Sequence, residues 1–215
     1  MLKKSSLKRT RIKICGISTP EQALWAVEAG ADAIGLMFYD KSSRAVTIDQ
    51  AVAICAVLPP FVSAVGVFVD PDPSWVHAVI DQVPLALLQF HGFERDSFCD
   101  SFQMPFTKAI PMNEHTHLED SIQAYPHAKA FLLDTASSKG FGGTGQSFDW
   151  SVIPKSISRP IILAGGLTPE NVAEAILQVD PFAVDVSSGV ESAPGVKDPE
   201  KIKQFMKEVN CAKSS

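Results

Sequence analysis

The chain has 215 residues, 46% of them apolar, which is enough for one large buried core, so we expect one compact domain. Its formal net charge is −5, but the first thirteen residues carry six cations and no acid, so 13 bases face 24 acids in the remainder. An acidic body argues against a nucleic-acid surface, and the lack of any run of about 18 apolar residues excludes a transmembrane helix. We expect neither nucleic acid nor a membrane among its partners.

The basic segment at the start, residues 1–10, is expected to be a disordered tail. The apolar run behind it is broken at Gly16, too early for a secretory signal peptide. The cysteines show no paired spacing typical of a disulfide framework or a zinc site. They are Cys15, Cys55, Cys99 and Cys211. The interrupted apolar run and the unpaired cysteine spacing both predict a cytoplasmic protein.

Eight short runs rich in β-branched residues alternate with amphipathic segments, as a parallel sheet with crossover helices requires. The predicted strands are Ile12–Cys15, Ala33–Phe38, Val62–Phe68, Leu85–Phe90, Phe106–Ile110, Ala130–Leu133, Ile161–Leu163 and Ala183–Val186. The predicted helices are Pro20–Ala29, Ile48–Val57, Pro73–Gln82, Asn171–Gln178 and Pro199–Val209, with weaker signals near Leu118–Ala124 and within Phe148–Ser156. We therefore predict an α/β fold in which residues 11–215 form a single (βα)8 TIM barrel with eight parallel strands. An open doubly wound sheet would need fewer strands and a different glycine pattern.

Two glycine-bearing turns follow the last two predicted strands. Ala164-Gly165-Gly166 comes after the seventh strand, and Ser187-Ser188-Gly189 comes after the eighth. In such a barrel these two loops bind phosphate through backbone N–H groups and a helix N-terminus. Thr168-Pro169-Glu170 supports this interpretation, because Thr168 is expected to be an N-cap and Pro169 the first helical residue. We predict one phosphate site, with simple tight turns as the alternative.

Active sites of β/α barrels lie at the carboxyl ends of the strands, where Cys15 and Asp134 end the first and sixth runs. Cys15 is flanked by Lys13 and Gly16, which favours a reactive thiolate, although a lone cysteine is often a buried structural thiol. Asp134 leaves an apolar strand, and loss of water there favours a protonated acid that can donate a proton. Its alternative role is a turn aspartate that caps the following loop.

Other polar residues follow the remaining strands. The glycine-rich segment 137–145 is expected to be a lid over the substrate or else a disordered excursion. Arg44 could pair with a substrate carboxylate or make a surface ion pair. His91 could line the pocket or satisfy the core. His115 and His117 have no third ligand at suitable spacing, so we expect no metal.

From Arg11 to about Val209 the sequence resembles the phosphoribosylanthranilate isomerases of tryptophan biosynthesis. The motifs in matching order are Lys13-Ile14-Cys15-Gly16-Ile17, Ser43-Arg44-Ala45-Val46, Val65-Gly66-Val67-Phe68, Gln89-Phe90-His91-Gly92, Gly142-Gly143-Thr144-Gly145, Leu163-Ala164-Gly165-Gly166-Leu167, Asn171-Val172 and Val184-Asp185-Val186-Ser187-Ser188-Gly189-Val190-Glu191, leading to Lys197-Asp198. The resemblance implies an Amadori rearrangement of N-(5-phosphoribosyl)anthranilate to 1-(2-carboxyphenylamino)-1-deoxyribulose 5-phosphate, with no metal or organic cofactor. The implied partner is this phosphorylated aminosugar, and the chain is expected to be a monomer or homodimer.

The resemblance also implies a role for each matching residue. Cys15 becomes the general base and Asp134 the general acid. Arg44 holds the substrate carboxylate, and Asp185 and His91 orient the substrate. The implied phosphate-binding residues are Gly165, Gly166, Ser187, Ser188 and Gly189.

Two other functions compete with this one. Another phosphosugar barrel, such as the histidine-pathway aminoaldose isomerase or indole-glycerol-phosphate synthase, would favour an aspartate in place of Cys15 or a lysine-rich site. A non-catalytic barrel that binds a phosphorylated ligand would tolerate loss of Cys15 and Asp134. A turnover assay separates these hypotheses.

Overall fold

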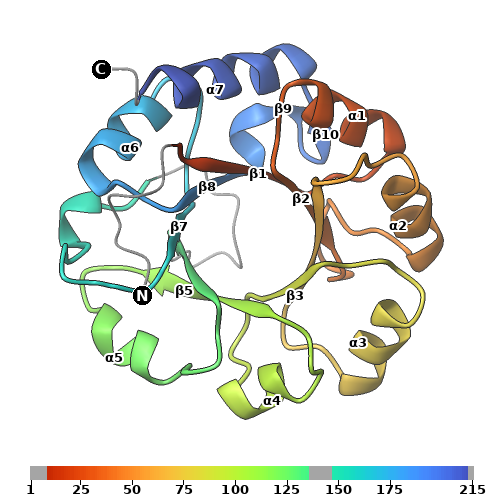
Figure 1. Ribbon diagram of the computed structural model, residues 1–215, viewed down its shortest axis with the longest axis horizontal. Coiled ribbons are helices and arrows are strands. Elements are labelled where there is room, and N and C mark those ends of the chain that lie inside the picture. Colours follow the sequence, from red (N-terminus) through yellow and green to blue (C-terminus); the bar gives the residue numbers. More distant parts are fainter. Residues whose placement is uncertain (1–8, 136–146, 213–215) are drawn as a thin grey trace.

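The computed structural model describes residues 9–135 and 147–212, and a closed barrel of eight parallel strands forms its centre (Figure 1). The strands follow chain order around the barrel, and β1 closes it by pairing with β8. Their bounds are β1 Arg11–Cys15, β2 Ala33–Met37, β3 Ser63–Phe68, β4 Leu87–Phe90, β5 Phe106–Met112, β6 Ala130–Thr135, β7 Ile161–Leu163 and β8 Ala183–Val186. The predicted α/β barrel is confirmed.

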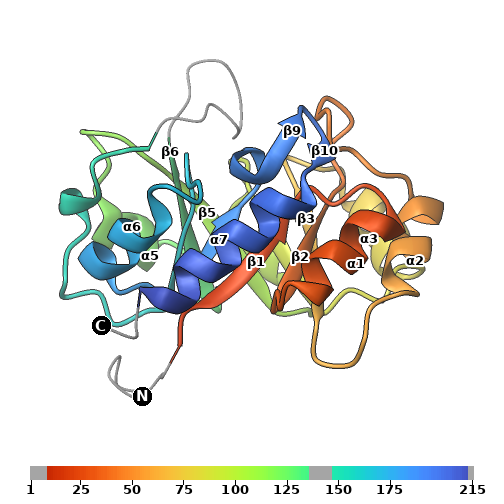
Figure 2. The ribbon, with the colours of Figure 1, turned by 90° about the horizontal axis from the view of Figure 1, so that it is seen from above.

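Helices surround the strands (Figures 1 and 2). They are α1 Pro20–Glu28, α2 Ile48–Cys55, α3 Pro73–Ile80, α4 Asp96–Asp100, α5 Leu118–Gln123, α6 Val172–Val179 and α7 Pro199–Cys211, with 3₁₀ segments η2 Trp150–Val152 and η3 Ser188–Val190. After η3 comes a hairpin of β9 Glu191–Ala193 and β10 Val196–Lys197. Side chains of Thr19, Thr47 and Asp72 cap the first three helices, each by accepting a backbone N–H bond.

The helix predictions differ from the structure in three places. Between β6 and β7 a helix is predicted within Phe148–Ser156, but the described residues there form only η2, which Asp149 caps. The five residues of α4 are too few to show helical periodicity in the sequence, and no helix is predicted there. The predicted helix Asn171–Gln178 is found one residue later, as α6, but Thr168 is not its N-cap and Pro169 is not its first residue. The Val172 N–H donates to Thr168 O at 3.1 Å, so the segment between them is a turn.

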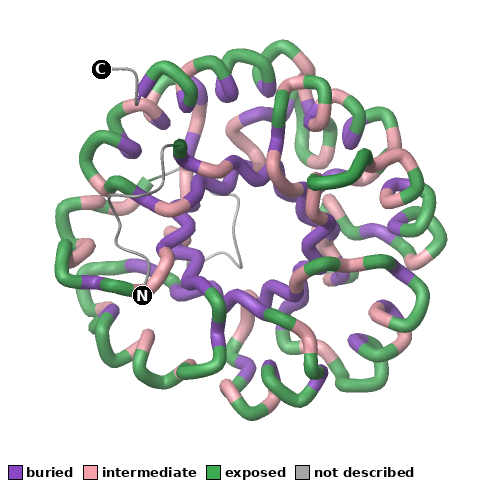
Figure 3. The backbone as a smooth tube through the Cα atoms, viewed as in Figure 1, coloured by how far each residue is buried: buried purple, intermediate pink, exposed green. Residues whose placement is uncertain are grey.

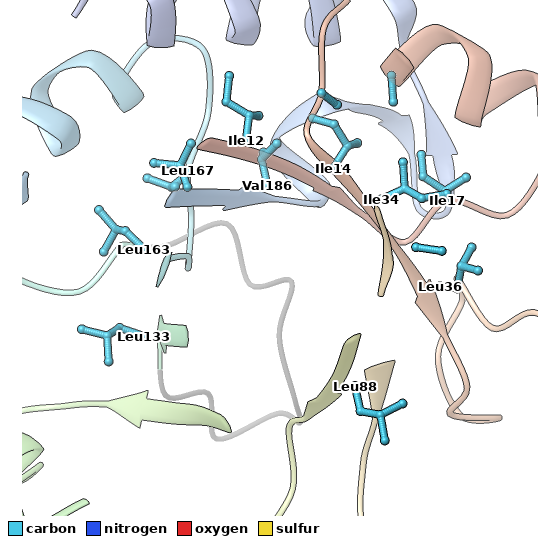
Figure 4. Close-up of a cluster of buried hydrophobic side chains, with 14 of the residues drawn as sticks. Ile12, Ile14, Ile17, Ile34, Leu36, Leu88, Leu133, Leu163, Leu167 and Val186 are labelled. Carbon is cyan, nitrogen blue, oxygen red and sulfur yellow. The ribbon is translucent and has the colours of Figure 1, made fainter. Parts of the chain in front are cut away.

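The core has two layers because side chains alternate between the two faces of each strand. Ile12 and Ile14 of β1 pack toward the helices with other large aliphatic side chains (Figure 4). The barrel interior holds a smaller apolar group, Ala109, Ala130, Leu132, Ile162, Ala164 and Ala183. Figure 3 shows the strands as a largely buried ring. Lys13 and Cys15 alternate with the two isoleucines and therefore face the barrel interior.

Most of the predicted basic tail, residues 1–10, lies outside the described residues. Of its last two residues, Arg9 pairs with Asp32, and Thr10 is buried, so packing begins before residue 11. No helix in the described ranges is both long enough and apolar enough to cross a membrane.

Candidate active site

A pocket of about 440 Å³ opens at the carboxyl ends of the strands, where a barrel site is expected. It gathers side chains from strands and loops that are far apart in the sequence. The predicted site residues that line it are Cys15, Arg44, His91, Asp134, Gly165, Gly166, Asp185, Ser187 and Ser188. Gly189 is not among the lining residues.

The two glycine-bearing turns are packed tightly against their neighbours. Gly165 and Gly166 have φ of +80° and +64°, in the left-handed region that favours glycine. A Cβ at Gly165 would lie 2.5 Å from the Thr135 backbone nitrogen and 3.0 Å from Asp134 Oδ1. A Cβ at Gly189 would overlap the carbonyl oxygen of Leu167. Gly189 therefore joins the two turns to each other, behind the surface of the pocket.

Cys15 is buried at the end of β1, against Gly35 of β2. A Cβ at Gly35 would lie 2.6 Å from Cys15 Sγ and 3.1 Å from Lys13 Cε, so both side chains pack on the same bare glycine. Burial raises the pKa of the Cys15 thiol, and Asp185 acts in the same direction, while the charges of Lys13 and Lys197 act against it. The thiolate fraction therefore grows in the alkaline range.

Lys13 and Asp185 form a buried ion pair beside Cys15. The register of β1 against β8 places the two residues opposite each other, with Lys13 Nζ 2.7 Å from Asp185 Oδ2. Burial alone would lower the pKa of Lys13, but the charges of Asp185 and Cys15 outweigh it and raise this pKa. Lys13 therefore stays an ammonium ion. Asp185 Oδ1 is buried with no hydrogen-bond partner among the described residues.

Asp134 and His91 meet on the opposite side of the pocket. His91 Nε2 lies 3.1 Å from Asp134 Oδ2, and the Thr135 N–H donates to Asp134 Oδ1 at 2.8 Å. Gln89 Nε2 lies 3.1 Å from His91 Nδ1. An amide nitrogen only donates, so a neutral His91 accepts at Nδ1 and donates from Nε2 to Asp134 Oδ2. His91 thus orients Asp134.

A second buried ion pair, Glu94 with Lys108, lies behind His91. Lys108 Nζ is 3.0 Å from Glu94 Oε2 and donates to the Gly92 carbonyl at 2.6 Å. Glu94 Oε1 accepts from the Asp70 N–H at 2.8 Å, and Tyr125 Oη donates to the Glu94 carbonyl at 2.8 Å. These contacts join the loops after β3 and β4 to β5. They hold the loop that begins at His91.

Arg44 is paired with a carboxylate of the protein itself. Its Nε and Nη2 donate to Glu191 Oε1 and Oε2, each at 2.7 Å, in a bidentate pair. The fully buried Lys197 lies 2.7 Å from Glu191 Oε1 and donates to the Ser187 carbonyl at 3.0 Å. Glu191 raises the pKa of Arg44 through its hydrogen bonds. Arg44 lines the pocket and Glu191 is buried behind it, so this is not the surface pair that the sequence leaves as an alternative.

Sequence reasoning assigns no role to Gln89, Glu191 or Lys197, although charged residues directly after the eighth strand are a signal that could have drawn attention to the last two. The predicted lid, residues 137–145, lies outside the described residues. In the described ranges, no group of three or more side chains could hold a metal ion. His115 instead lies beside Glu114 on the surface, with Nε2 3.4 Å from Oε1.

The barrel is closed, and polar side chains and two glycine-bearing turns lie together at the carboxyl ends of its strands. This is the arrangement of β/α-barrel enzymes. Residues 12–208 match the family model described as N-(5'phosphoribosyl)anthranilate (PRA) isomerase. The chain belongs to this family.

Similar proteins agree with this assignment. The N-(5'-phosphoribosyl)anthranilate isomerase of Pseudomonas fluorescens (strain Pf-5) is 53% identical over 205 residues, which cover 95% of this chain and 98% of the relative. A phosphoribosyl anthranilate isomerase structure from Thermotoga maritima has a TM-score of 0.87 and 43% identity, covering 94% of this chain and 99% of that one. Another isomerase structure, in complex with reduced 1-(o-carboxyphenylamino)-1-deoxyribulose 5-phosphate, has a TM-score of 0.83 and 42% identity, with the same coverage of both chains.

Proposed function

We infer that this chain is an isomerase of tryptophan biosynthesis that converts N-(5-phosphoribosyl)anthranilate to 1-(2-carboxyphenylamino)-1-deoxyribulose 5-phosphate. The observation that carries this inference is the family match over residues 12–208. The solved relative that holds the reduced product supports the same substrate class.

The reaction begins with opening of the ribose ring. In our proposal the Asp134 carboxyl group donates its proton to the ring oxygen. The bond between this oxygen and C1 breaks, and the nitrogen lone pair forms a C1–N double bond, which leaves a positive iminium nitrogen and an Asp134 carboxylate. The hydrogen bond from His91 Nε2 supports this role, because it stabilises the carboxylate formed in this step.

The second step removes the proton on C2 of the opened sugar. The Cys15 thiolate takes this proton as a base, and the C–H electrons form a C1–C2 double bond while the nitrogen becomes neutral. The resulting enol then loses its hydroxyl proton as C1 gains one, which yields the ketone. Cys15 gives its proton to water and Asp134 takes one from water, so both groups return to their starting states. Cys15 and Asp134 both line the pocket, from strands on different sides of the barrel, and this supports their action on one substrate. The reaction as written uses no cofactor.

The two ends of the substrate need separate binding groups. Arg44 Nη1 lies outside the bidentate pair with Glu191, and we assign it to the anthranilate carboxylate. The backbone N–H groups of the turns Gly165–Gly166 and Ser187–Ser188 are assigned to the phosphate, with Gly189 holding these turns together. Asp185 Oδ1, the buried oxygen, is the assigned acceptor for a sugar hydroxyl.

The activity is tested by adding purified protein to N-(5-phosphoribosyl)anthranilate and following the loss of substrate fluorescence. We expect rapid loss with the parent protein. The double variant Cys15→Ala/Asp134→Asn, purified in the same way, controls for contaminating isomerase. A parent rate equal to that of the control would refute the proposed activity and favour the non-catalytic barrel.

The phosphate site is tested with inorganic phosphate as the probe. Phosphate should raise the melting temperature of the parent protein by linkage, and it should protect Gly166→Val much less. Gly30→Val is a matched control, because Gly30 also has a positive φ, +97°, but does not line the pocket. If phosphate raised the melting temperatures of Gly166→Val and the parent equally, the phosphate site would not include this turn.

The proposal includes a cytoplasmic location and a monomer or homodimer as the assembly. Free cysteines fit a reducing compartment. One solved structure is of mutually generated monomers of the dimeric phosphoribosylanthranilate isomerase from Thermotoga maritima. Analytical ultracentrifugation of the purified chain distinguishes the two assemblies.

A further inference from the structure

Lys13 is a buried charged residue that the proposed mechanism does not use. It is buried and is not among the residues that line the pocket. It lies on β1, two residues before Cys15, and strand alternation places both side chains on the inner face of the barrel. Its effect on the reaction must therefore pass through a neighbouring side chain.

The packing brings Lys13 to Cys15 rather than to the open pocket. Both side chains lie against Gly35, where an added Cβ would be 2.6 Å from Cys15 Sγ and 3.1 Å from Lys13 Cε. The Lys13 ammonium is held on its other side by Asp185 Oδ2, 2.7 Å away. Lys13 thus contacts one potential anion on its own strand, Cys15, and one on β8, Asp185.

The charges around Cys15 come from several elements. Lys13 on β1 and Lys197 on β10 favour the thiolate, as does Arg44 after β2, whereas Asp185 on β8 opposes it. Lys13 has the largest favourable effect, and its own pKa is raised by Cys15 in return.

We propose that the Lys13 ammonium is the positioned counter-ion of the Cys15 thiolate and that Asp185 holds it in place. Before turnover the Cys15 thiol gives its proton to water, and Lys13 keeps all three of its own. The three groups then carry a net charge of −1, with one ammonium shared by two anions. When the sulfur takes the C2 proton, the net charge returns to zero. The catalytic part of this proposal rests on the proposed function of Cys15.

The test measures how fast iodoacetamide alkylates Cys15 at a series of pH values, with the Cys15 peptide quantified by mass spectrometry. Only the thiolate reacts, so the midpoint of the rate curve reports its formation. In Lys13→Gln we expect this midpoint to rise by about one pH unit or more, the usual scale for losing an adjacent opposite charge. The exposed Cys211 in the same sample is the internal control, and its midpoint should not move.

Two further variants separate an electrostatic role from packing. Asp185→Asn removes the anion that competes for Lys13, so the Cys15 midpoint should fall, opposite to the change in Lys13→Gln. Lys13→Arg keeps the charge and should stay nearer to the parent than Lys13→Gln does. An unchanged midpoint in Lys13→Gln, or a shift of the same sign in Lys13→Gln and Asp185→Asn, would overturn the proposal. If Lys13→Gln does not fold, the Asp185→Asn midpoint decides: a fall supports the proposal, and an unchanged or raised midpoint overturns it.

Alkylation needs no substrate, so this test is independent of the isomerase activity. If Cys15 is also the base, the alkaline rise of kcat/KM in Lys13→Gln should shift in the same direction as the alkylation midpoint. A shifted alkylation midpoint with an unshifted activity profile would reject Cys15 as the base while leaving Lys13 as its counter-ion.

Discussion

The two sides of the barrel mouth use buried charge differently. On the side of β1 and β8, which we call the base side, two ion pairs each have one member that lines the pocket. Asp185 faces the pocket while its partner Lys13 lies behind, and Arg44 faces the pocket while Glu191 lies behind. On the side of β4 to β6, the acid side, neither member of the pair Glu94–Lys108 lines the pocket.

This difference separates electrostatic from mechanical control. On the base side a bound substrate meets charged groups whose partners fix their direction. On the acid side it meets His91 and Asp134, joined by one hydrogen bond of 3.1 Å, while the charges are used to hold the loop behind them. Breaking the buried Glu94–Lys108 pair on the acid side should therefore act through stability, whereas breaking a pair on the base side also changes a group that faces the substrate.

The largest effect is expected from removing the base itself. Cys15→Ala should lower kcat by about 10²–10⁴-fold, the usual contribution of a general base, while the variant stays folded. Steady-state kinetics measure this loss. Cys55→Ala is the matched control, because Cys55 is on α2 and does not line the pocket, and it should keep the parent kcat. A kcat for Cys15→Ala close to that of the parent would show that Cys15 is not the general base.

The next largest effect should be a loss of stability on the acid side. Lys108→Met leaves the Glu94 carboxylate buried without its partner, which should lower the free energy of unfolding by about 3–5 kcal/mol. Urea denaturation measures this change. Lys203→Met breaks an exposed pair with Glu200 and should change stability little. Equal losses in the two variants would contradict a structural role for the buried pair.

A smaller effect is expected from the hydrogen bond between the two acid-side residues. His91→Asn should lower kcat by about 10- to 150-fold, because a hydrogen bond to a charged group contributes about 1.5–3 kcal/mol. If His91 acts by orienting Asp134, it should matter little once Asp134 is gone. The double variant His91→Asn/Asp134→Asn should then be no slower than Asp134→Asn alone. Fully additive losses would show that His91 acts independently.

The smallest effect concerns the response of the base side to acid. Burial raises the pKa of Glu191, but hydrogen bonds and charge from Arg44 and Lys197 outweigh burial and lower this pKa below 4.5. Glu191 therefore adds stability that is present above pH 4.5 and is lost as the pH falls through its lowered folded-state pKa. Glu191→Gln should lose less stability than the parent between pH 6 and about 3. If the unfolding free energies of the two proteins changed in parallel with pH, Glu191 would not contribute this pH-dependent stability.

Local sequence patterns predict the strands well and their ends less well. The bounds of β7 and β8 agree with the prediction, because apolar β-branched runs stop there at glycine and serine. β6 continues through Asp134 and Thr135, two residues beyond the apolar run, because β5 supplies partners for both. The length of the neighbouring strand thus determines where the polar end of β6 lies, and the local sequence of β6 does not contain this information.

In the candidate site, too, some residues can be predicted from local sequence and others cannot. Residues at strand ends, such as Cys15 and Asp134, can be proposed from the order of strands alone. The partners that orient them cannot, because Arg44 meets Glu191 across 147 positions and Lys13 meets Asp185 across 172. Such pairs exist only once the barrel closes. Their charges in the sequence are indistinguishable from those on a solvated face.

The contact between Gly189 and the Leu167 carbonyl has a consequence for dividing this barrel into fragments. β7 and β8 share only two register pairs, Ile162 with Ala183 and Leu163 with Val184, so their seam is short. Beyond the ends of these strands, the loop that follows β8 presses directly on the loop that follows β7. If the chain were divided into two fragments between β7 and β8, the fragments would have to re-form the contact between Gly189 and the Leu167 carbonyl when they associate. Neither loop can be exchanged for that of another barrel unless its neighbour is exchanged with it.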